Sequence, residues 1–453
     1  MTQHIEQFKK IGLGILIGLI IFSLSLIIFN PLQASLLGII ALLVTLWTNE
    51  GLPFAVVSLL PILLFPAFSI LTTKATAVNY AHPIIYLFLG GFMLAIAVEK
   101  SNLHTVIADK MLGLFPNTPR GMIFSLAITS GLLSSILSNT TTTLLLMSIA
   151  LFITTDLKLK MRFALAIAYG ASVGGILTPI GTPPNLILLG IMNDKGMEAI
   201  PFFQWVWMVA PLAMVMFVVV SLLLSLGVPN TPIHRDSENK PLDSTQKKII
   251  YIMGGLIFLL LINAPMKPFW GGLGLSEAGI LLSAGLLLFM PPINVLKWDE
   301  DSTKIPYKIM FLFGAGFSIA KAFSGTGLAD EVASYLIVMT QLNPIVLLFA
   351  VAMLITFTTE ITSNTALISI MLPVIYSVAE QTGINTTLFM MVATLCASYA
   401  FMLPIATPSN AIAMSSGAVN VKSMIRYGIV LNLVGIFCIV MIAEFFWKGI
   451  LTT

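Results

Sequence analysis

Long apolar runs separated by short polar connections extend along almost the whole chain. The runs that favour membrane-crossing helices are 11–29, 34–49, 53–70, 83–99, 163–193, 202–226, 249–264, 276–292, 307–323, 386–415 and 425–447. Most of them hold enough consecutive apolar residues for a helix to cross a hydrocarbon layer of about 30 Å. The pattern therefore predicts an all-α polytopic membrane protein.

Two further apolar runs, 121–154 and 345–378, are interrupted in the middle by polar residues. Ser138–Thr140 interrupts the first run, and Ser363–Thr365 interrupts the second. Unpaired backbone groups in a bilayer cost several kcal/mol, and Ser and Asn favour helix N-caps because their side chains accept from free N–H groups. Each run is therefore predicted to be a re-entrant hairpin, with two half-helices meeting at a polar tip. The N–H groups and the positive helix end at that tip would face an anion.

Two of the predicted spans carry a proline-containing segment in the middle. Pro179–Asn185 divides the run 163–193, and Pro404–Asn410 divides the run 386–415. Proline removes a helical hydrogen bond and is tolerated inside a membrane where neighbours satisfy the backbone. Both runs are therefore predicted to be broken helices. On its own such a segment is usually a kink, and a Ser-Asn-Thr triplet on its own is usually a helix cap or an inter-helix contact.

The polar tips and the breaks occur twice at one spacing. Asn139 is repeated 225 residues later as Asn364, and Asn185 recurs at the same offset as Asn410. Chance alignment of separate motifs at one offset is improbable, so the chain is predicted to be an internal duplication. The predicted organisation is a first span in 1–30, repeat 1 in 31–228 with the hairpin 121–154 and the broken helix 163–193, a linker in 229–248, and repeat 2 in 249–453 with the hairpin 345–378 and the broken helix 386–415.

Lysine and arginine positions predict the orientation, because these residues concentrate in cytoplasmic loops. Arg120 and Lys158–Arg162 flank the hairpin 121–154, which is therefore expected to enter from the cytoplasm. The segments beside the hairpin 345–378 contain neither residue type, so this hairpin is expected to enter from outside. The halves are thus predicted to be inverted repeats, with the N-terminus and the linker cytoplasmic and the C-terminus outside. Inverted repeats with broken helices near the membrane midplane are typical of transporters.

The composition excludes most other classes of protein. Apolar residues make up 58% of the chain and charged residues 9%, which is more apolar surface than a soluble domain could hide. The net charge of +3 is ordinary for a membrane protein, and no nucleic-acid partner is expected. The sequence contains no recognisable catalytic triad, phosphate-binding loop or metal-ligand cluster, so an enzyme is disfavoured.

The polar tips suit an anion with two charged ends. Asn amides, Thr hydroxyls and helix N-termini can replace the hydration that an anion loses inside a bilayer, and two equivalent tips provide one site for each end. Behind each tip, the free carbonyls of the first arm lie near Ser134 and Ser138, or near Thr359 and Thr362. Oxygen shells without carboxylates suit a monovalent cation such as Na⁺, which would help offset the charge of the anion.

Three ionisable residues fall within or at the end of predicted membrane segments. Glu360 lies one helical turn before Asn364, with Ser135 at the equivalent position of the first half. An intramembrane carboxylate is a functional candidate, and a structural pairing with Lys321 is the alternative. Lys100 and Lys321 either neutralise a bound anion or extend to the membrane interface.

The residues also resemble a known family. The two Ser-Asn-Thr triplets and the segment Ala397–Ile412 resemble the paired motifs and the C-terminal fingerprint of the divalent anion/sodium symporter (DASS) family of dicarboxylate, citrate and sulfate carriers. The fingerprint typically continues with Val, where this chain has Ala413. The resemblance extends over essentially the whole chain. It implies about 11 transmembrane helices, a homodimer formed through a scaffold part, and an elevator-like transport part that carries both hairpins.

The resemblance also implies roles for individual residues. Asn139 and Thr140 in one tip, and Asn364 and Thr365 in the other, would hold the substrate carboxylates. The candidate substrate-binding residues are Ser138, Asn139, Thr140, Thr182, Pro183, Ser363, Asn364, Thr365, Thr407 and Pro408. The candidate cation ligands are Ser134, Ser138, Asn139 and Gly181 in one site and Thr359, Thr362, Asn364 and Ala406 in the other.

These observations together predict a secondary active transporter in the cytoplasmic membrane. The expected substrates are C4–C5 dicarboxylates such as succinate, malate and 2-oxoglutarate, or tricarboxylates, carried either by sodium-coupled symport or by dicarboxylate exchange. A carrier for sulfate or another divalent anion, and a channel or non-transporting membrane subunit, are the alternatives. Na⁺ is the candidate coupling ion and no other cofactor is expected. The expected partners are the small anion, the lipid bilayer and a second copy of the chain.

Overall fold

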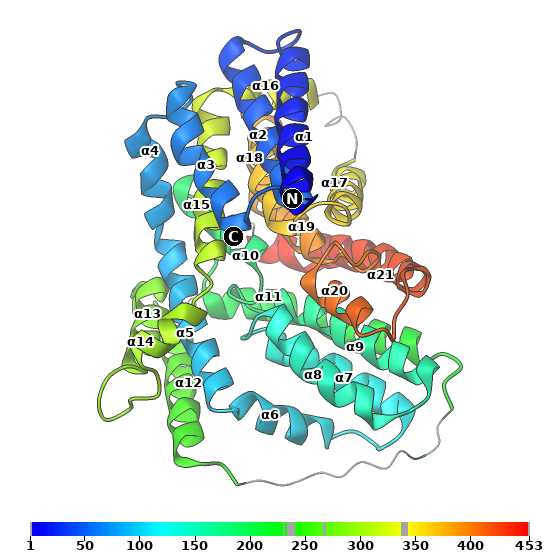
Figure 1. Ribbon diagram of the computed structural model, residues 1–453. Helices are drawn as coiled ribbons and strands as arrows, with labels where there is room; N and C mark the ends of the chain where they lie inside the picture. Colours follow the sequence, from blue (N-terminus) through cyan, green and yellow to red (C-terminus); the bar gives the residue numbers. More distant parts are fainter. Residues whose placement is uncertain (1, 230–231, 233–240, 266–268, 337–342, 452–453) are drawn as a thin grey trace.

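The computed structural model describes residues 2–229, 232, 241–265, 269–336 and 343–451 (Figure 1). Over these residues the regular elements are helices, as the apolar pattern predicts. Part of the predicted linker 229–248 lies outside the described residues. The helix that follows the linker begins at Ser244, where Asp243 accepts from the backbone N–H of Gln246 and forms a capping box with it.

The first half of the chain contains a hairpin and a broken helix among longer helices. Its elements are α1 (Thr2–Ser25), α2 (Pro31–Asn49), α3 (Phe54–Ala67), α4 (Thr73–Ala77), α5 (Pro83–Lys100), α6 (Leu103–Leu112), the hairpin arms α7 (Pro119–Ser134) and α8 (Asn139–Ile153), the broken pair α9 (Leu157–Gly175) and α10 (Pro183–Asp194), and α11 (Phe202–Ser225). A 3₁₀ turn, Val78–Ala81, joins α4 to α5.

The second half repeats this order of elements. It comprises α12 (Ser244–Asn263), α13 (Glu277–Leu287), α14 (Trp298–Asp301), α15 (Tyr307–Gly325), α16 (Leu328–Leu336), the hairpin arms α17 (Pro344–Thr359) and α18 (Asn364–Thr382), the broken pair α19 (Thr386–Ser398) and α20 (Pro408–Ser415), α21 (Val421–Ile442) and α22 (Lys448–Leu451). The last two helices are joined by a π-helical turn, Ala443–Trp447.

Seven described helices are long and apolar enough to cross a membrane, or up to eight when the bent pair α15 and α16 counts as one span. This count differs from the predicted total of about 11, because it includes α18, an arm of a predicted hairpin, and omits four predicted spans. Two predicted spans are each divided into a pair of shorter helices, α9 with α10 and α19 with α20. Two others, α3 and α13, are helical over only 14 and 11 residues. The count of 11 stays a prediction.

The two halves pack their helices in the same way. In the first half α7 packs on α9, and α11 packs on both; in the second half α17 packs on α19, and α21 packs on both. The pairs α3 with α15 and α5 with α13 are likewise equivalent to each other at the 225-residue offset. The halves also contact each other through α10 on α18 and through α20 on α8, among other pairs. The hairpins and broken helices of both halves therefore meet in the middle of the molecule (Figure 1).

Close backbone contact between α7 and α9 depends on glycine. A Cβ atom on Gly174 would lie 1.9 Å from the carbonyl oxygen of Gly131, and one on Gly170 would lie 2.3 Å from the carbonyl oxygen of Ala127. The positions equivalent to Gly131 and Gly174 are Thr356 and Tyr399 in the second half. Small residues let membrane helices approach closely, so the first hairpin is held directly against its broken helix.

Candidate binding site between the two hairpins

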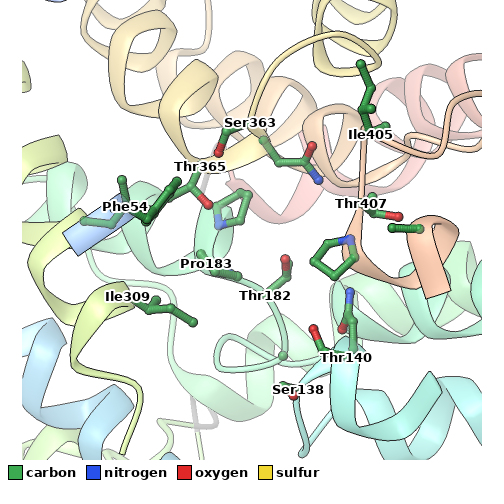
Figure 2. Close-up of a pocket in the computed structure, with 18 of the residues that line it drawn as sticks. Phe54, Ser138, Thr140, Thr182, Pro183, Ile309, Ser363, Thr365, Ile405 and Thr407 are labelled. Carbon is green, nitrogen blue, oxygen red and sulfur yellow. The ribbon is translucent and has the colours of Figure 1, made fainter. Parts of the chain in front are cut away.

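A cavity of about 870 Å³ lies where the two hairpin tips and the two helix breaks converge (Figure 2). In Figure 2, Ser363 and Thr365 lie on one side of it, Ser138 and Thr140 lie on the opposite side, and Thr182 lies between them. All ten of the residues that the sequence places in the substrate site line this cavity: Ser138, Asn139, Thr140, Thr182, Pro183, Ser363, Asn364, Thr365, Thr407 and Pro408. Helices α2, α3, α5 and α15 supply the facing wall.

The first tip is built from a helix cap and a fixed amide. Ser138 caps α8, since its Oγ accepts from the backbone N–H of Thr141 at 3.1 Å and donates to the hydroxyl of Thr141 at 2.9 Å. Ser134, the last residue of α7, donates its hydroxyl to Oδ1 of Asn139 at 2.5 Å. The Asn139 side chain is therefore oriented by the opposite arm of its own hairpin.

The second tip has the same arrangement. Ser363 caps α18 by accepting from the backbone N–H of Ala366 at 3.5 Å. Thr359 donates to Oδ1 of Asn364 at 2.6 Å and also reaches the carbonyl oxygen of Ala397 at 2.9 Å. The two amide groups are thus held by equivalent hydroxyls at the 225-residue offset.

Two asparagines hold the loops at the helix breaks. Nδ2 of Asn185 donates to the carbonyl oxygens of Thr178 at 2.9 Å and Gly175 at 3.4 Å. Asn410 makes the equivalent bonds in the second half, to Leu403 at 3.0 Å and Ala400 at 2.9 Å. Both asparagines are fully buried. Sequence reasoning used these two asparagines only to align the two halves and assigned them no role. Their exact repetition at the 225-residue offset was the signal that could have indicated one.

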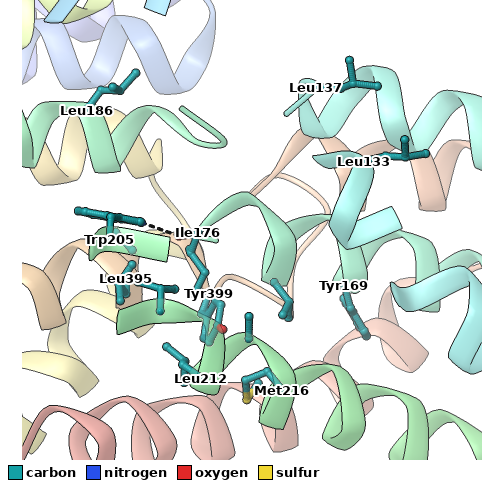
Figure 3. Packing of buried hydrophobic residues seen from close by; sticks show 14 of the residues in the cluster. Leu133, Leu137, Tyr169, Ile176, Leu186, Trp205, Leu212, Met216, Leu395 and Tyr399 are labelled. Carbon is teal, nitrogen blue, oxygen red and sulfur yellow. Dashed lines mark hydrogen bonds between the residues drawn. The ribbon is translucent and has the colours of Figure 1, made fainter. Parts of the chain in front are cut away.

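Packing behind the first break fixes its loop. The indole N–H of Trp205 donates to the carbonyl oxygen of Ile176 at 3.0 Å, and Trp205 is fully buried (Figure 3). Leu212 and Met216, further along α11, pack beside Tyr399 in the same cluster. A carbonyl freed by the end of α9 is satisfied in this way, as a buried helix terminus requires.

Four helices begin at the wall of the cavity. Their first residues, Asn139 of α8, Pro183 of α10, Asn364 of α18 and Pro408 of α20, all line it. Each helix N-terminus carries roughly half a positive charge together with N–H groups that lack a helical partner. Among the described residues that line the cavity, Glu50 is the one with an ionisable side chain. An anion bound here would face helix dipoles, amides and hydroxyls in place of lysine or arginine.

The eight candidate cation ligands divide into two kinds. Six of them line the cavity: Ser138, Asn139, Gly181, Thr362, Asn364 and Ala406. The other two, Ser134 and Thr359, lie behind the tips and hydrogen-bond to the Asn139 and Asn364 amide oxygens. Hydroxyl, amide and carbonyl oxygens form a donor set that a monovalent cation accepts. Within the described ranges, no group of three or more His, Cys, Asp or Glu side chains could hold a transition metal or calcium.

Glu360 makes structural contacts next to the second tip. Its carboxylate is 3% exposed and accepts from the backbone N–H groups of Met402 and Leu403, each at 2.9 Å, and from the Asn432 amide at 2.6 Å. These donors satisfy a charge that would otherwise be costly to bury. The alternative pairing with Lys321 is wrong, because Lys321 is exposed and no described ion pair joins the two residues.

Lys100 also lies away from the cavity. It pairs with the carboxylate of Asp301 at 2.5 Å, and Asp301 is 2% exposed. Burial acts to raise the pKa of Asp301, but hydrogen bonds from Lys100, from the Lys297 backbone and from Lys304 together hold that pKa below its usual value. The charge of Lys100 is therefore engaged in holding the end of α5 against α14.

The family and the relatives that this chain resembles are all described as transporters. A family described as citrate transporter matches residues 40–385. A sodium-dependent dicarboxylate transporter, SdcS, from Staphylococcus saprophyticus is 30% identical over 97% of this chain and 93% of its own length. The SdcS of Staphylococcus aureus (strain USA300) is also 30% identical, over 96% of this chain and 90% of its own length.

Two solved structures share the fold. The YdaH transporter of Alcanivorax borkumensis superimposes with a TM-score of 0.60 at 17% identity, covering 83% of this chain and 88% of that chain. MtrF of Neisseria gonorrhoeae, described within a class of antimetabolite efflux pumps, superimposes with a TM-score of 0.60 at 16% identity, covering 84% and 85%. At these identities the likeness concerns the arrangement of helices and not the substrate.

Proposed function

The chain belongs to the citrate transporter family, and from that premise we propose that it is a secondary carrier that moves a small dicarboxylate together with sodium. It is a carrier of the divalent anion/sodium symporter type and not an enzyme. The proposal concerns the substrate, the coupling ion, the site residues and the mode of movement.

The observation that carries the proposal is the convergence of four helix N-termini on one cavity with two equivalent amide tips. A dicarboxylate has two anionic ends, so one carboxylate would accept from Asn139 and Thr140 and the other from Asn364 and Thr365. A cavity of about 870 Å³ has room for a C4–C5 acid with its remaining water. The duplication then has a chemical meaning, since each half supplies one carboxylate site.

Sodium coupling follows from the charges around this cavity. The described lining contains no lysine or arginine, and the candidate Lys100 is paired with Asp301 away from the cavity. Helix dipoles offset only part of a dianion's charge. Cations bound by Ser134, Ser138, Asn139 and Gly181, and by the equivalent residues of the second half, would supply the rest. The relatives named sodium-dependent dicarboxylate transporters support this choice over dicarboxylate exchange.

We further propose that the two hairpins and the two broken helices move together. Elements α7–α11 and α17–α21 pack on one another and carry both tips, whereas α2, α3, α5 and α15 supply the facing wall. An elevator movement would carry the first group past the second and expose the cavity to each side in turn. The repeat boundaries, the inverted orientation with a cytoplasmic N-terminus, the plasma-membrane location and the homodimer belong to the same proposal.

The test is uptake of labelled succinate into liposomes that contain the purified protein. Symport predicts sodium-dependent uptake into vesicles without internal substrate. Uptake that requires internal dicarboxylate and ignores sodium would refute sodium coupling and establish exchange. Counterflow into preloaded vesicles separates a carrier, which accumulates label, from a channel, which does not.

A further inference from the structure

A second cavity adjoins the substrate cavity. It has a volume of about 550 Å³ and lies between the start of α1 and the turn from α2 to α3. Its lining residues are Glu6, Gln7, Lys10, Trp47, Glu50, Leu52, Pro53 and Phe54. Three of these, Trp47, Glu50 and Phe54, line the substrate cavity as well. These three residues form the boundary between the two cavities, and a solute that moves from one to the other passes them.

Glu50 brings a negatively charged side chain to this boundary. It is exposed, and within the described chain neither a hydrogen bond nor an ion pair engages its carboxylate. Lys10, the cation of the second cavity, lies 3.9 Å from Glu6. A dicarboxylate at the boundary would therefore meet a like charge that no described partner neutralises.

The backbone at Glu50 is one that a glutamate rarely adopts. Its φ of 52° and ψ of 38° are left-handed, and it forms the C-cap of α2. Glycine or asparagine adopts this conformation at less cost. The turn is held in place, because Asn49 donates to the carbonyl oxygen of Lys10 at 2.9 Å and accepts from the N–H of Gly51 at 2.8 Å. A residue kept in an unfavourable conformation without a stabilising contact of its own points to a function for its side chain.

We propose that Glu50 is a specificity-determining residue that selects the transported anion by charge, admitting dicarboxylates and disfavouring tricarboxylates. This inference rests on the proposed function, because it assumes that the adjoining cavity binds a dicarboxylate. Specificity of this kind works by repulsion of the wrong ligand. Repulsion by a fixed charge grows with the charge of the ligand. Each additional carboxylate therefore weakens binding of the ligand, although the two hairpin tips by themselves would not exclude it.

The experiment compares two ligands that differ by one charge. Propane-1,2,3-tricarboxylate and 3-methylglutarate share a five-carbon diacid backbone and carry a carboxylate or a methyl group at its third carbon. Both compete with labelled succinate for the purified full-length protein in detergent with saturating sodium, where both faces are accessible. For Glu50→Gln, we expect the ratio of the two inhibition constants, tricarboxylate over methylglutarate, to fall by about threefold to tenfold. Added choline chloride should lower this ratio in the wild type and leave it unchanged in the variant.

Matched variants separate charge from structure. Glu6→Gln removes a carboxylate that lines the second cavity only, and Glu50→Asp keeps the charge, so both should retain the wild-type ratio within about twofold. Glu50→Asn provides a neutral side chain that tolerates the left-handed backbone, in case glutamine impairs folding. A wild-type ratio in both neutral variants, or an equal change for both ligands, would overturn the inference. Failure of the wild type to bind succinate would instead overturn the proposed function.

Discussion

The two hairpin tips are alike where they face the cavity and different behind it. Towards the cavity, each presents an asparagine amide held by a hydroxyl from the other arm, Ser134 for Asn139 and Thr359 for Asn364. Behind the second tip stands the carboxylate of Glu360, and the equivalent residue of the first half is Ser135. The chemistry that faces the cavity is therefore the same in both halves, while the support for each tip is not.

The contacts behind the two tips differ in charge and in the elements that they join. Glu360 binds the loop of the second break through two backbone N–H groups and α21 through the Asn432 amide. Around the first tip the corresponding contact is neutral, with the Thr178 hydroxyl donating to the carbonyl oxygen of Ser135 at 2.5 Å. The residue equivalent to Asn432 is Trp207, which is 62% exposed. The difference teaches that two equivalent hairpin tips can keep the same cavity-facing groups while unrelated contacts support them.

The largest effect on transport is expected where the halves are alike. Alanine at Asn139 or at Asn364 removes an amide that would bind a desolvated carboxylate, at a cost of about 1.5–3 kcal/mol, which is roughly tenfold to 150-fold in affinity. The double variant should show no measurable succinate uptake in proteoliposomes. Asn263→Ala, which removes a buried amide that bonds to the backbone of Leu275 and does not line the cavity, is the matched control and should keep uptake. Near-normal uptake by a folded double variant would mean that the tips are helix caps only.

The next prediction concerns stability, which should depend on the residue behind the second tip more than on its equivalent in the first half. Glu360→Gln replaces one carboxylate oxygen with a donor that faces an N–H group, leaving at least one buried donor unsatisfied. We expect a loss of about 2–4 kcal/mol in the free energy of unfolding. Ser135→Ala should cost less than about 1 kcal/mol, because the Ser135 contact to Thr178 uses its backbone carbonyl. Thermal unfolding of both variants in detergent is the measurement, and equal losses would contradict the asymmetry.

The cap positions and the helix breaks were accessible from the sequence because they depend on local chemistry. Ser138 and Ser363 follow an apolar arm and precede another, and a serine in that position caps the new helix. The hairpin arms run from Pro119 to Ile153 and from Pro344 to Thr382, where the predicted ranges were 121–154 and 345–378. The convergence of ten candidate residues on one cavity followed from the duplication, since equivalent positions in two packed halves face each other.

The contacts behind the tips were not accessible from the sequence, because they join distant parts of the chain. The Asn432 amide is 72 residues from Glu360, and nothing in its local sequence distinguishes it from a polar residue on a lipid-facing helix. Lys321 was the alternative partner on charge alone, but backbone N–H groups freed by the second break satisfy the carboxylate instead. The carbonyl contacts of Asn185 were missed because they close a loop whose shape no pattern gives.

A smaller and equal effect is expected for the two asparagines that close the break loops. Asn185→Ala and Asn410→Ala each leave two buried carbonyl oxygens without their donor. Each variant should lose about 1–3 kcal/mol of stability, with the two losses within about 1 kcal/mol of each other. Thermal unfolding without substrate measures this. A large difference between them would show that the breaks, like the tips, are braced unequally.

The smallest expected difference lies at the residue that immediately precedes each break helix. Thr407 caps α20, since its hydroxyl accepts from the backbone N–H of Asn410 at 3.2 Å. Thr182 occupies the same position before α10 but makes no side-chain cap bond. Valine keeps the shape of threonine and removes the hydroxyl, so Thr407→Val should cost about 0.5–2 kcal/mol, and Thr182→Val should cost less than about 0.5 kcal/mol. Both variants would also lose a hydroxyl from the cavity wall, so the comparison is made by thermal unfolding in the absence of substrate. An equal loss in both would mean that Thr182 also caps its helix in solution, which would make the two breaks more alike than the structure has them.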